Sequence, residues 1–242
     1  PIQTLVELTE KMIDLGVKNI LVEKPLSLDE NNLIKLTKVA KDKKTNIFVA
    51  YNRRFFSSII SAINIIKSNN QKISSVIFEF NESFNSIKGP DYQPKVIQNQ
   101  WITANSLHVI DAAFFKSGLP NLNNSTFCSH QTGLKWHPSG DIFTGNGLTD
   151  KNISFSYHAN WNAPGRWWFQ WLTNDYRFIF KPMEQLAIMK KNSFDEKIVD
   201  LKFNYDKKFK PGVYLQNKKF IIDNDNTNLV TLDYAIKLIQ IS

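Results

Sequence analysis

The sequence has few of the features that mark secreted, membrane-spanning or disulfide-stabilised proteins. It holds one cysteine, Cys128, among 242 residues, so it can form neither an internal disulfide nor a metal site built from several cysteines. No apolar run approaches the roughly 18 residues that cross a bilayer, and the best candidate, residues 59–66, is interrupted by Ser61 and Asn64. These absences fit a reducing compartment. We therefore expect a cytoplasmic protein with no membrane partner.

Disorder and nucleic-acid binding are also disfavoured. Hydrophobic residues make up 42% of the chain and aromatic residues 13%, which is enough for a sizeable core. The 30 Lys and Arg exceed the 22 Asp and Glu, for a net charge of +8, but the lysines are scattered or stand beside acids. A nucleic-acid binder more typically shows a concentrated basic stripe interleaved with aromatics. We expect a solvated basic surface and no nucleic-acid partner.

The first fifty residues alternate between helix and strand patterns. Apolar residues at helical spacing predict helices over 4–15 and 27–44, and apolar runs predict buried parallel strands over 18–23 and 46–51. This order is typical of a parallel α/β sheet, although it begins on a helix. Pro1 opens the chain without a methionine, a basic segment or an apolar signal stretch. We therefore expect the chain to be the later part of a longer protein.

The pattern changes after Tyr51, and we place a domain boundary there. Further helices are predicted over 55–68, 104–116 and 229–239, and strands over 73–82, 153–158, 167–172, 176–180 and 186–190. Turn signals between these short strands favour a mostly antiparallel sheet. The sequence thus predicts an α/β protein with a parallel unit at 1–51 and an α+β domain at 52–242.

The first candidate site is Glu23-Lys24-Pro25, directly after the first predicted strand. Open α/β sheets bind ligands beyond the carboxyl ends of their strands. Pro25 restricts Lys24 to an extended backbone, and loss of solvation in such a crevice would lower the pKa of the lysine toward neutrality and suit it to proton transfer. On these grounds alone, a solvated lysine before a turn proline is the more common arrangement.

The second candidate is the pair His108 and Asp111 in an otherwise apolar helix. The two residues stand three apart and share a helix face. The carboxylate could orient the imidazole or stabilise its protonated form, and a buried polar pair must be satisfied. A structural hydrogen-bonded pair and a catalytic pair explain the pattern equally well.

In this order, the two motifs resemble the Gfo/Idh/MocA family of NAD(P)-dependent oxidoreductases, whose signatures include Glu-Lys-Pro and a helix ending His-x-x-Asp. Segments 51–55, 160–167 and 209–212 also look like a subgroup found among surface-polysaccharide and sugar-nucleotide genes. The resemblance implies that residues 1–51 are the C-terminal part of an NAD(P)-binding Rossmann domain. It further implies that residues 52–242 form a substrate and oligomerisation domain that makes dimers or tetramers.

The resemblance also implies roles for individual residues. The catalytic group would be Lys24, His108 and Asp111, with Asp111 positioning His108. Glu23, Lys24 and Pro25 would line the nicotinamide end of an NAD or NADP site. Asn52, Arg53, Asn105 and Arg166 would contact the substrate.

The sequence departs from the family pattern at two places. Ala104 and Ser106 stand where the family helix usually has Asp and Gly, which leaves the proton relay open, and Asn105 could supply a polar contact instead. The Gly-x-Gly-x-x-Gly turn that cradles a pyrophosphate would precede Pro1. We therefore expect this chain on its own to bind NAD(P) poorly and to be inactive, and the apolar faces of its first two helices to be uncovered.

Other conspicuous residues carry weaker hypotheses. Trp161, Trp167, Trp168 and Trp171 could form a sugar-stacking platform, but such residues more often belong to a core or an interface. The remaining histidines, His130, His137 and His158, lack ligand spacing, so no metal is expected. Cys128 is interpreted as a small buried hydrophobe.

The sequence therefore favours an oxidoreductase that transfers a hydride between a nicotinamide cofactor and a hydroxyl or ketone of a sugar or sugar nucleotide. A non-catalytic sugar-binding or subunit-interaction module derived from the same family is the alternative.

Overall fold

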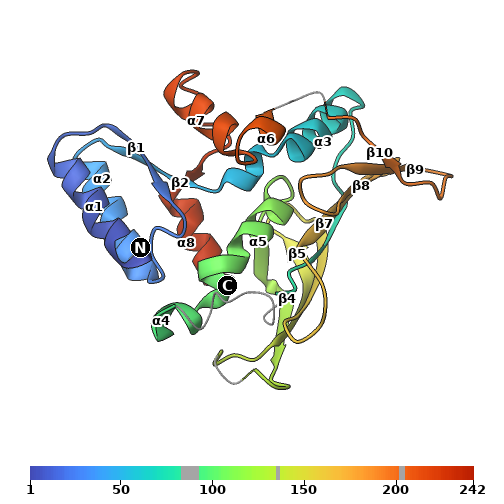
Figure 1. Ribbon diagram of the computed structural model, residues 1–242, viewed down its shortest axis with the longest axis horizontal. Helices are drawn as coiled ribbons and strands as arrows, with labels where there is room; N and C mark the ends of the chain where they lie inside the picture. The colour runs from blue at the N-terminus through green and yellow to red at the C-terminus, as the bar shows by residue number, and fades with distance from the viewer. Residues whose placement is uncertain (83–92, 135–136, 202–204) are drawn as a thin grey trace.

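The computed structural model describes residues 1–82, 93–134, 137–201 and 205–242. Figure 1 shows the chain from the blue N-terminal helices to the large sheet on the opposite side. A three-stranded sheet with order β1-β2-β11 forms one part, and an eight-stranded sheet with order β10-β9-β8-β7-β3-β6-β5-β4 forms the other. Within the described ranges, no helix is long and apolar enough to cross a membrane.

The smaller sheet begins with the predicted alternation. The elements are α1 (Ile2–Asp14), β1 (Asn19–Glu23), α2 (Glu30–Asp42) and β2 (Asn46–Ala50). Asp29 caps α2 by accepting the N–H of Asn31 at 2.9 Å. The two strands pair in parallel along their whole length, so Glu23 stands opposite Ala50 and their carboxyl ends meet at one edge. This edge positions the first candidate site.

The C-terminal segment returns to this sheet. β11 (Val230–Thr231) pairs antiparallel with β2, with Val230 opposite Val49. Thr231 caps α8 (Leu232–Gln240) by accepting the N–H of Tyr234, and α8 packs against α2. In Figure 1 the red α8 lies between the blue helices and the green α5. The unit expected at 52–242 therefore contains a segment that completes the sheet of the first fifty residues.

The apolar faces of the first two helices differ in their cover. On α1, Leu8, Met12 and Leu15 are exposed, as the sequence predicts. On α2, Leu33 and Leu36 are buried, and this helix packs against α8 as well as α1 and β2. The expectation of an uncovered face is therefore wrong for α2, and part of its cover comes from nearly 200 residues further along the chain.

Two helical segments connect the sheets. η1 (Asn52–Phe55) follows β2 directly, and α3 (Ser57–Ser68) leads into the larger sheet. That sheet contains β3 (Ser75–Glu79), β4 (Pro120–His130), β5 (Ile142–Thr149), β6 (Ser154–Asn160), β7 (Trp168–Leu172), β8 (Tyr176–Phe180), β9 (Ala187–Lys190) and β10 (Lys197–Ile198). All neighbouring pairs are antiparallel except β3 with β6. The mostly antiparallel sheet predicted from the sequence is confirmed.

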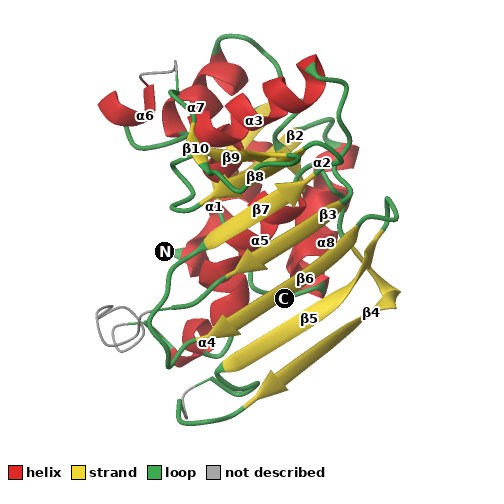
Figure 2. Cartoon of the chain, turned by 90° about the vertical axis from the view of Figure 1, so that its right-hand side faces the viewer, coloured by secondary structure: helices red, strands yellow, loops and turns green. Residues whose placement is uncertain are grey.

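Helices cover one face of the larger sheet, as Figure 2 shows with the other face toward the viewer. α4 (Lys95–Gln98) precedes η3 (Ile102–Ser106), a π-helical turn that runs into α5 (Leu107–Phe114). The buried Trp171 of β7 donates its indole N–H to the carbonyl of Ala113 at 2.8 Å, and Phe78 of β3 packs edge-on against Phe114. These contacts fix α5, which carries the second candidate site, against the sheet.

The tryptophans and the cysteine take different places. Trp161 and Trp171 are buried in the core, while Trp167 and Trp168 are half-buried. The expectation of a buried Cys128 is wrong, because this residue lies exposed on β4 at the edge of the sheet. Within the described ranges, the chain also forms three α-helices that the sequence patterns did not predict: α4, α6 (Tyr205–Lys208) and α7 (Val213–Ile221).

Candidate functional site

Lys24 extends from the carboxyl end of β1 to the π-helical turn before α5. Its Nζ donates to the carbonyl oxygens of Ala104 at 2.9 Å and Asn105 at 3.2 Å. The Lys24–Pro25 peptide bond is cis, and Pro25 is buried. Burial, with a contribution from the nearby Arg53 cation, lowers the pKa of Lys24 to about 7. The amine is therefore poised to gain or lose a proton near neutral pH.

His108 lies in the first turn of α5, shortly after Ala104 and Asn105, among aromatic rings. Its ring is 6.2 Å from Tyr51 and 6.3 Å from Trp167, measured between centroids. Burial, followed by the charges of Lys24 and Arg53, lowers the pKa of His108 well below 6.5. The imidazole is therefore neutral at pH 7 and can accept a proton or a hydrogen bond.

Asp111 does not hold His108, which corrects the expected pairing. Its fully buried carboxylate accepts two hydrogen bonds from Nε of Arg54, at 2.9 and 3.1 Å, and one from Nη2 at 2.5 Å. Within the described residues, Nδ1 of His108 has no hydrogen-bond partner. Residues three apart on a helix share a face, but the carboxylate of Asp111 binds Arg54 of η1 instead, and this ion pair compensates its buried charge.

Glu82 is a buried carboxylate that the sequence patterns did not reveal. It follows β3 and its Oε1 accepts from Nδ2 of Asn105 at 2.9 Å, Oγ of Ser106 at 3.0 Å and Nε1 of Trp167 at 3.2 Å. Burial raises the pKa of Glu82 to about 7, against the effect of these hydrogen bonds. A single acid after a strand has no distinguishing pattern, so the sequence offered no signal for it.

Asn52 and Arg53 begin η1, immediately beyond β2. Asn52 donates from Nδ2 to the carbonyl oxygen of Pro211 at 2.9 Å, which ties the loop before α7 to the site. The guanidinium of Arg53 lies 5.0 Å from the ring of Trp167, within range of a cation–π interaction. The positive charge of Lys210, in the same loop, further lowers the pKa of His108.

Two neighbouring cavities surround these residues, and Arg53 and Glu184 line both. The first, of about 350 Å³, lies at the carboxyl ends of β1 and β2 and is lined in part by Glu23, Ala50, Asn52, His108 and Lys210. The second, of about 330 Å³, is lined in part by Glu82, Asn105, Arg166 and Trp167. The structure thus gathers Glu23, Asn52, Arg53, Asn105, His108 and Arg166 around adjoining cavities. Lys24 and Pro25 line neither cavity, and Asp111 is engaged with Arg54.

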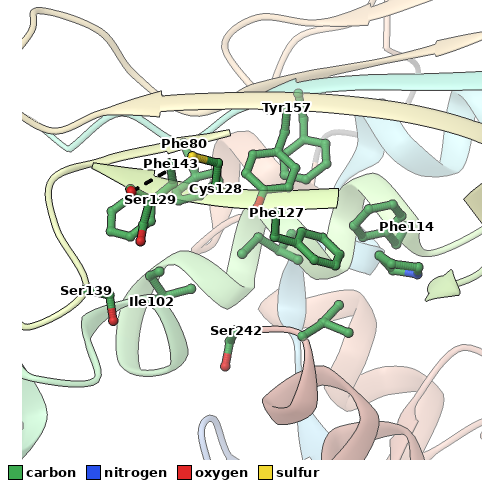
Figure 3. Close-up of a pocket in the computed structure, with 14 residues that line it drawn as sticks. Phe80, Ile102, Phe114, Phe127, Cys128, Ser129, Ser139, Phe143, Tyr157 and Ser242 are labelled. Atoms are coloured by element: carbon green, nitrogen blue, oxygen red, sulfur yellow. Dashed lines mark hydrogen bonds between the residues drawn. The ribbon is translucent and has the colours of Figure 1, made fainter. Parts of the chain in front are cut away.

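A third cavity, of about 200 Å³, lies elsewhere, between the helix-covered face of the sheet and the C-terminus. Figure 3 shows the rings of Phe114, Phe127, Phe143 and Tyr157 on one side, with Ile102 and Ser242 below them. Its lining is mainly apolar and includes neither Lys24 nor His108. None of the residues predicted for the site lines the third cavity, so we do not treat it as the candidate site.

No protein-family model and no curated protein sequence matches the chain, but its fold matches solved structures. UDP-N-acetylglucosamine 3-dehydrogenase GnnA from Acidithiobacillus ferrooxidans has a TM-score of 0.73 at 13% identity, covering 100% of this chain and 73% of that chain. An oxidoreductase from Agrobacterium radiobacter in complex with NAD+, L-tartaric acid and magnesium has a TM-score of 0.72 at 12% identity, covering 99% and 72%.

A super-repressor mutant of Gal80p from Saccharomyces cerevisiae is similar to the same degree, with a TM-score of 0.74 at 13% identity over 98% of this chain and 73% of that chain. These structures are of the Gfo/Idh/MocA type. The chain therefore has that fold, with part of a Rossmann domain followed by a large, mostly antiparallel sheet, and the predicted fold class is confirmed.

Proposed function

We propose that the protein is an NAD(P)-dependent oxidoreductase that interconverts a hydroxyl and a ketone on a sugar or sugar nucleotide. The observation that carries the proposal is the state of Lys24. Its amine is buried at the carboxyl end of a parallel strand, has a pKa of about 7 and stands near a neutral His108. Groups that transfer protons at neutral pH need such pKa values.

The hydrogen bonds of Lys24 define what its neutral form does. A neutral amine has two N–H groups and one lone pair, and the carbonyls of Ala104 and Asn105 accept both N–H groups. The lone pair remains to take the proton of a substrate hydroxyl as its carbon is oxidised. In the reverse direction, the ammonium form returns that proton to the ketone oxygen. His108 shares this task as a second neutral acceptor.

The first cavity fits the nicotinamide end of a cofactor. It stands beyond the carboxyl ends of β1 and β2, where open α/β sheets bind nucleotides. Glu23 and Asn52 line it, and Pro25 is buried outside its lining. When bound, NAD or NADP supplies or accepts the hydride. The described residues contain no glycine-rich turn for the pyrophosphate, so the proposal for this chain covers the nicotinamide end alone.

The second cavity supports a polar, hydroxylated substrate. Arg53 and Arg166 offer positive charge, and Asn105 and Glu82 offer hydrogen-bonding groups. Such a lining suits a sugar with an anionic substituent. That one structural neighbour is named a UDP-N-acetylglucosamine 3-dehydrogenase is consistent with this substrate class.

The remaining residue assignments follow from the contacts. We propose that Asp111 supports the site through Arg54, which holds the segment that begins with Asn52 and Arg53. Self-association is proposed through the sheet face that Figure 2 shows without helices, giving a homodimer or homotetramer in the cytoplasm.

The test uses the full-length natural protein and its Lys24→Ala variant. Each is assayed for sugar-dependent reduction of NAD+ or NADP+ by absorbance. We expect the variant to lose turnover while its substrate binding changes little. Equal turnover in the two proteins would overturn the assignment of Lys24. Binding of sugars without turnover in the natural protein would instead favour the non-catalytic module.

A further inference from the structure

Glu82 lines the second cavity, but the proposed chemistry gives this buried acid no part in the transfer of a proton. Its side chain belongs to a residue that is 3% exposed, and the positive charge of Lys24 is among the factors that lower its pKa. Burying a carboxylate is costly unless hydrogen bonds or charges compensate. Three side-chain donors converge on one of its oxygens. An arrangement of this cost at the edge of a polar cavity calls for a specific role.

The three donors connect Glu82 to the main groups of the site. Asn105 and Ser106 belong to η3, and the carbonyls of Ala104 and Asn105 in this turn accept the two hydrogen bonds of Lys24. π-helical turns occur frequently at functional sites. By accepting a hydrogen bond from Asn105, Glu82 fixes the carbonyl groups that accept from the Lys24 amine.

The third donor, Trp167, extends the same support to two more residues. Its ring lies 6.3 Å from the ring of His108 and 5.0 Å from the guanidinium of Arg53. The hydrogen bond from Nε1 to Glu82 fixes the orientation of this ring. One carboxylate therefore anchors the surroundings of Lys24, His108 and Arg53.

The charges around Lys24 single out Glu82. Arg53 disfavours the ammonium form, whereas Glu23, Glu82 and Asp111 favour it. Asp111 is neutralised by its ion pair with Arg54, and Glu23 is exposed to water. Glu82 is thus the buried acid, within the described ranges, whose charge reaches Lys24 without an ion-pair partner of its own.

We propose that Glu82 is a positioning residue that holds the π-helical turn against Lys24 and sets the proton affinity of its amine. The role belongs to the site of the proposed oxidoreductase and rests on that function for its biological meaning. Its effect on Lys24 is nevertheless measurable in the absence of any substrate.

The test follows the reactivity of Lys24 with acetic anhydride as a function of pH, with peptide mass spectrometry as the readout. An amine reacts in its neutral form, so the midpoint of the curve reports its pKa. We expect a midpoint near 7 in the natural protein and a midpoint lower by about half a pH unit or more in Glu82→Gln. The acidic limb of kcat/KM for hydroxyl oxidation should move by the same amount.

Glu79→Gln is the matched control. Glu79 is the last residue of β3, three positions before Glu82, and accepts from the indole of Trp168 at 2.6 Å, but its side chain is on the opposite face of the sheet from Phe78. This variant should leave both the midpoint and the acidic limb unchanged. An unchanged midpoint in Glu82→Gln would overturn the proposal, even if that variant loses activity, because a merely structural role moves rates and not midpoints.

The outcomes separate the two proposals. If the midpoint shifts in Glu82→Gln but the natural protein transfers no hydride, the role of Glu82 is supported and the oxidoreductase function is overturned. If the natural protein transfers hydride but the midpoint does not shift, the oxidoreductase function is supported and the role of Glu82 is overturned. Where Glu82→Gln does not fold, Trp167→Phe serves, since it keeps a ring beside His108 and Arg53 and removes one donor to Glu82. With one donor fewer, the charged form of the Glu82 carboxylate is less stable, so the midpoint of the Lys24 curve should shift in the same direction by a smaller amount. The absence of any shift would contradict the proposed role of Glu82.

Discussion

The amine of Lys24 donates to the carbonyl oxygen of Ala104 at 2.9 Å, although 80 residues separate them in the sequence. This hydrogen bond joins the carboxyl end of β1 to the helix that packs on the larger sheet. It brings Lys24, the proposed proton-transfer group, from one part of the chain to the segment that carries His108 in the other. The site is therefore built where the two sheets meet.

Replacing Lys24 tests its part in turnover. Lys24→Ala should lower kcat of the full-length protein by about 10²–10⁴-fold, the usual contribution of a general acid or base, with a much smaller change in substrate Kd. Lys35→Ala on the exposed surface of α2 is the control and should keep full activity. A loss of affinity equal to the loss of rate would show that Lys24 binds substrate rather than transferring its proton.

The direction of the pH dependence follows from the lowered pKa of Lys24. Oxidation of a hydroxyl needs the neutral amine, so its rate should rise about tenfold per pH unit and level off near pH 7. Ketone reduction needs the ammonium form and should fall above that pH. Burial lowers the pKa of His108 well below 6.5, whereas burial raises the pKa of Glu82 to about 7, so Glu82 titrates in the same window as Lys24. A limb that persists in Lys24→Ala would assign the titration to another group.

Much of this architecture could be predicted from short, local patterns in the sequence. Short apolar runs at 18–23 and 46–51 gave β1 and β2 because strands buried on both faces are continuously apolar. Strand β4 was not predicted, since an exposed edge strand with the sequence Asn-Leu-Asn-Asn-Ser-Thr carries no such signal. The pairing of β11 with β2 joins segments 180 residues apart, and no local pattern encodes it.

The site was predictable to the extent that its residues follow recognisable motifs. Lys24 and His108 were predicted from their motifs, and the structure brings both to adjoining elements. The partner of Asp111 was not predicted. Helical spacing places Asp111 beside His108, while Arg54, which binds its carboxylate, comes from another segment. Glu82 was also missed, since its donors come from η3 and the loop before β7.

The ion pair of Arg54 and Asp111 should dominate the stability of this region. Asp111→Asn leaves a 5%-exposed guanidinium without its counter-charge, and we expect it to lower the free energy of unfolding by about 3–5 kcal/mol. The measurement is urea denaturation. Glu7→Gln, which breaks the exposed ion pair with Lys11, is the control and should change little. Comparable effects of the two variants would contradict the account.

Glu82 should make stability fall as the pH rises. Its pKa is raised from 4.5 unfolded to about 7 folded, so the native state binds more protons between these values, and stability present below pH 4.5 is lost by pH 7. The loss is at most about 3 kcal/mol. Glu82→Gln does not titrate, so its stability relative to the natural protein should increase across this window. Denaturation curves at pH 4.5 and 7 with a constant difference would rule this out.

Gly212 holds the loop of Lys210 against Asn52. Its φ of 73° lies in the left-handed region, and a Cβ there would collide with the carbonyl oxygen of Asn52. Gly212→Ala should cost at least about 2 kcal/mol of unfolding free energy. Gly16→Ala, with a φ of 83° and open space around the Cβ position, should cost about 1 kcal/mol. Equal costs would show that the contact with Asn52 is not a constraint.

The most direct test of the account is protection of Lys24 by a bound nicotinamide cofactor. The full-length natural protein is acetylated with and without NADH or NADPH at about ten times its Kd, and Lys24 is followed by mass spectrometry. We expect acetylation of Lys24 to slow about tenfold, as mass action requires, while Lys35 is unaffected. Saturable cofactor binding that leaves Lys24 fully reactive would contradict the placement of the nicotinamide in this site.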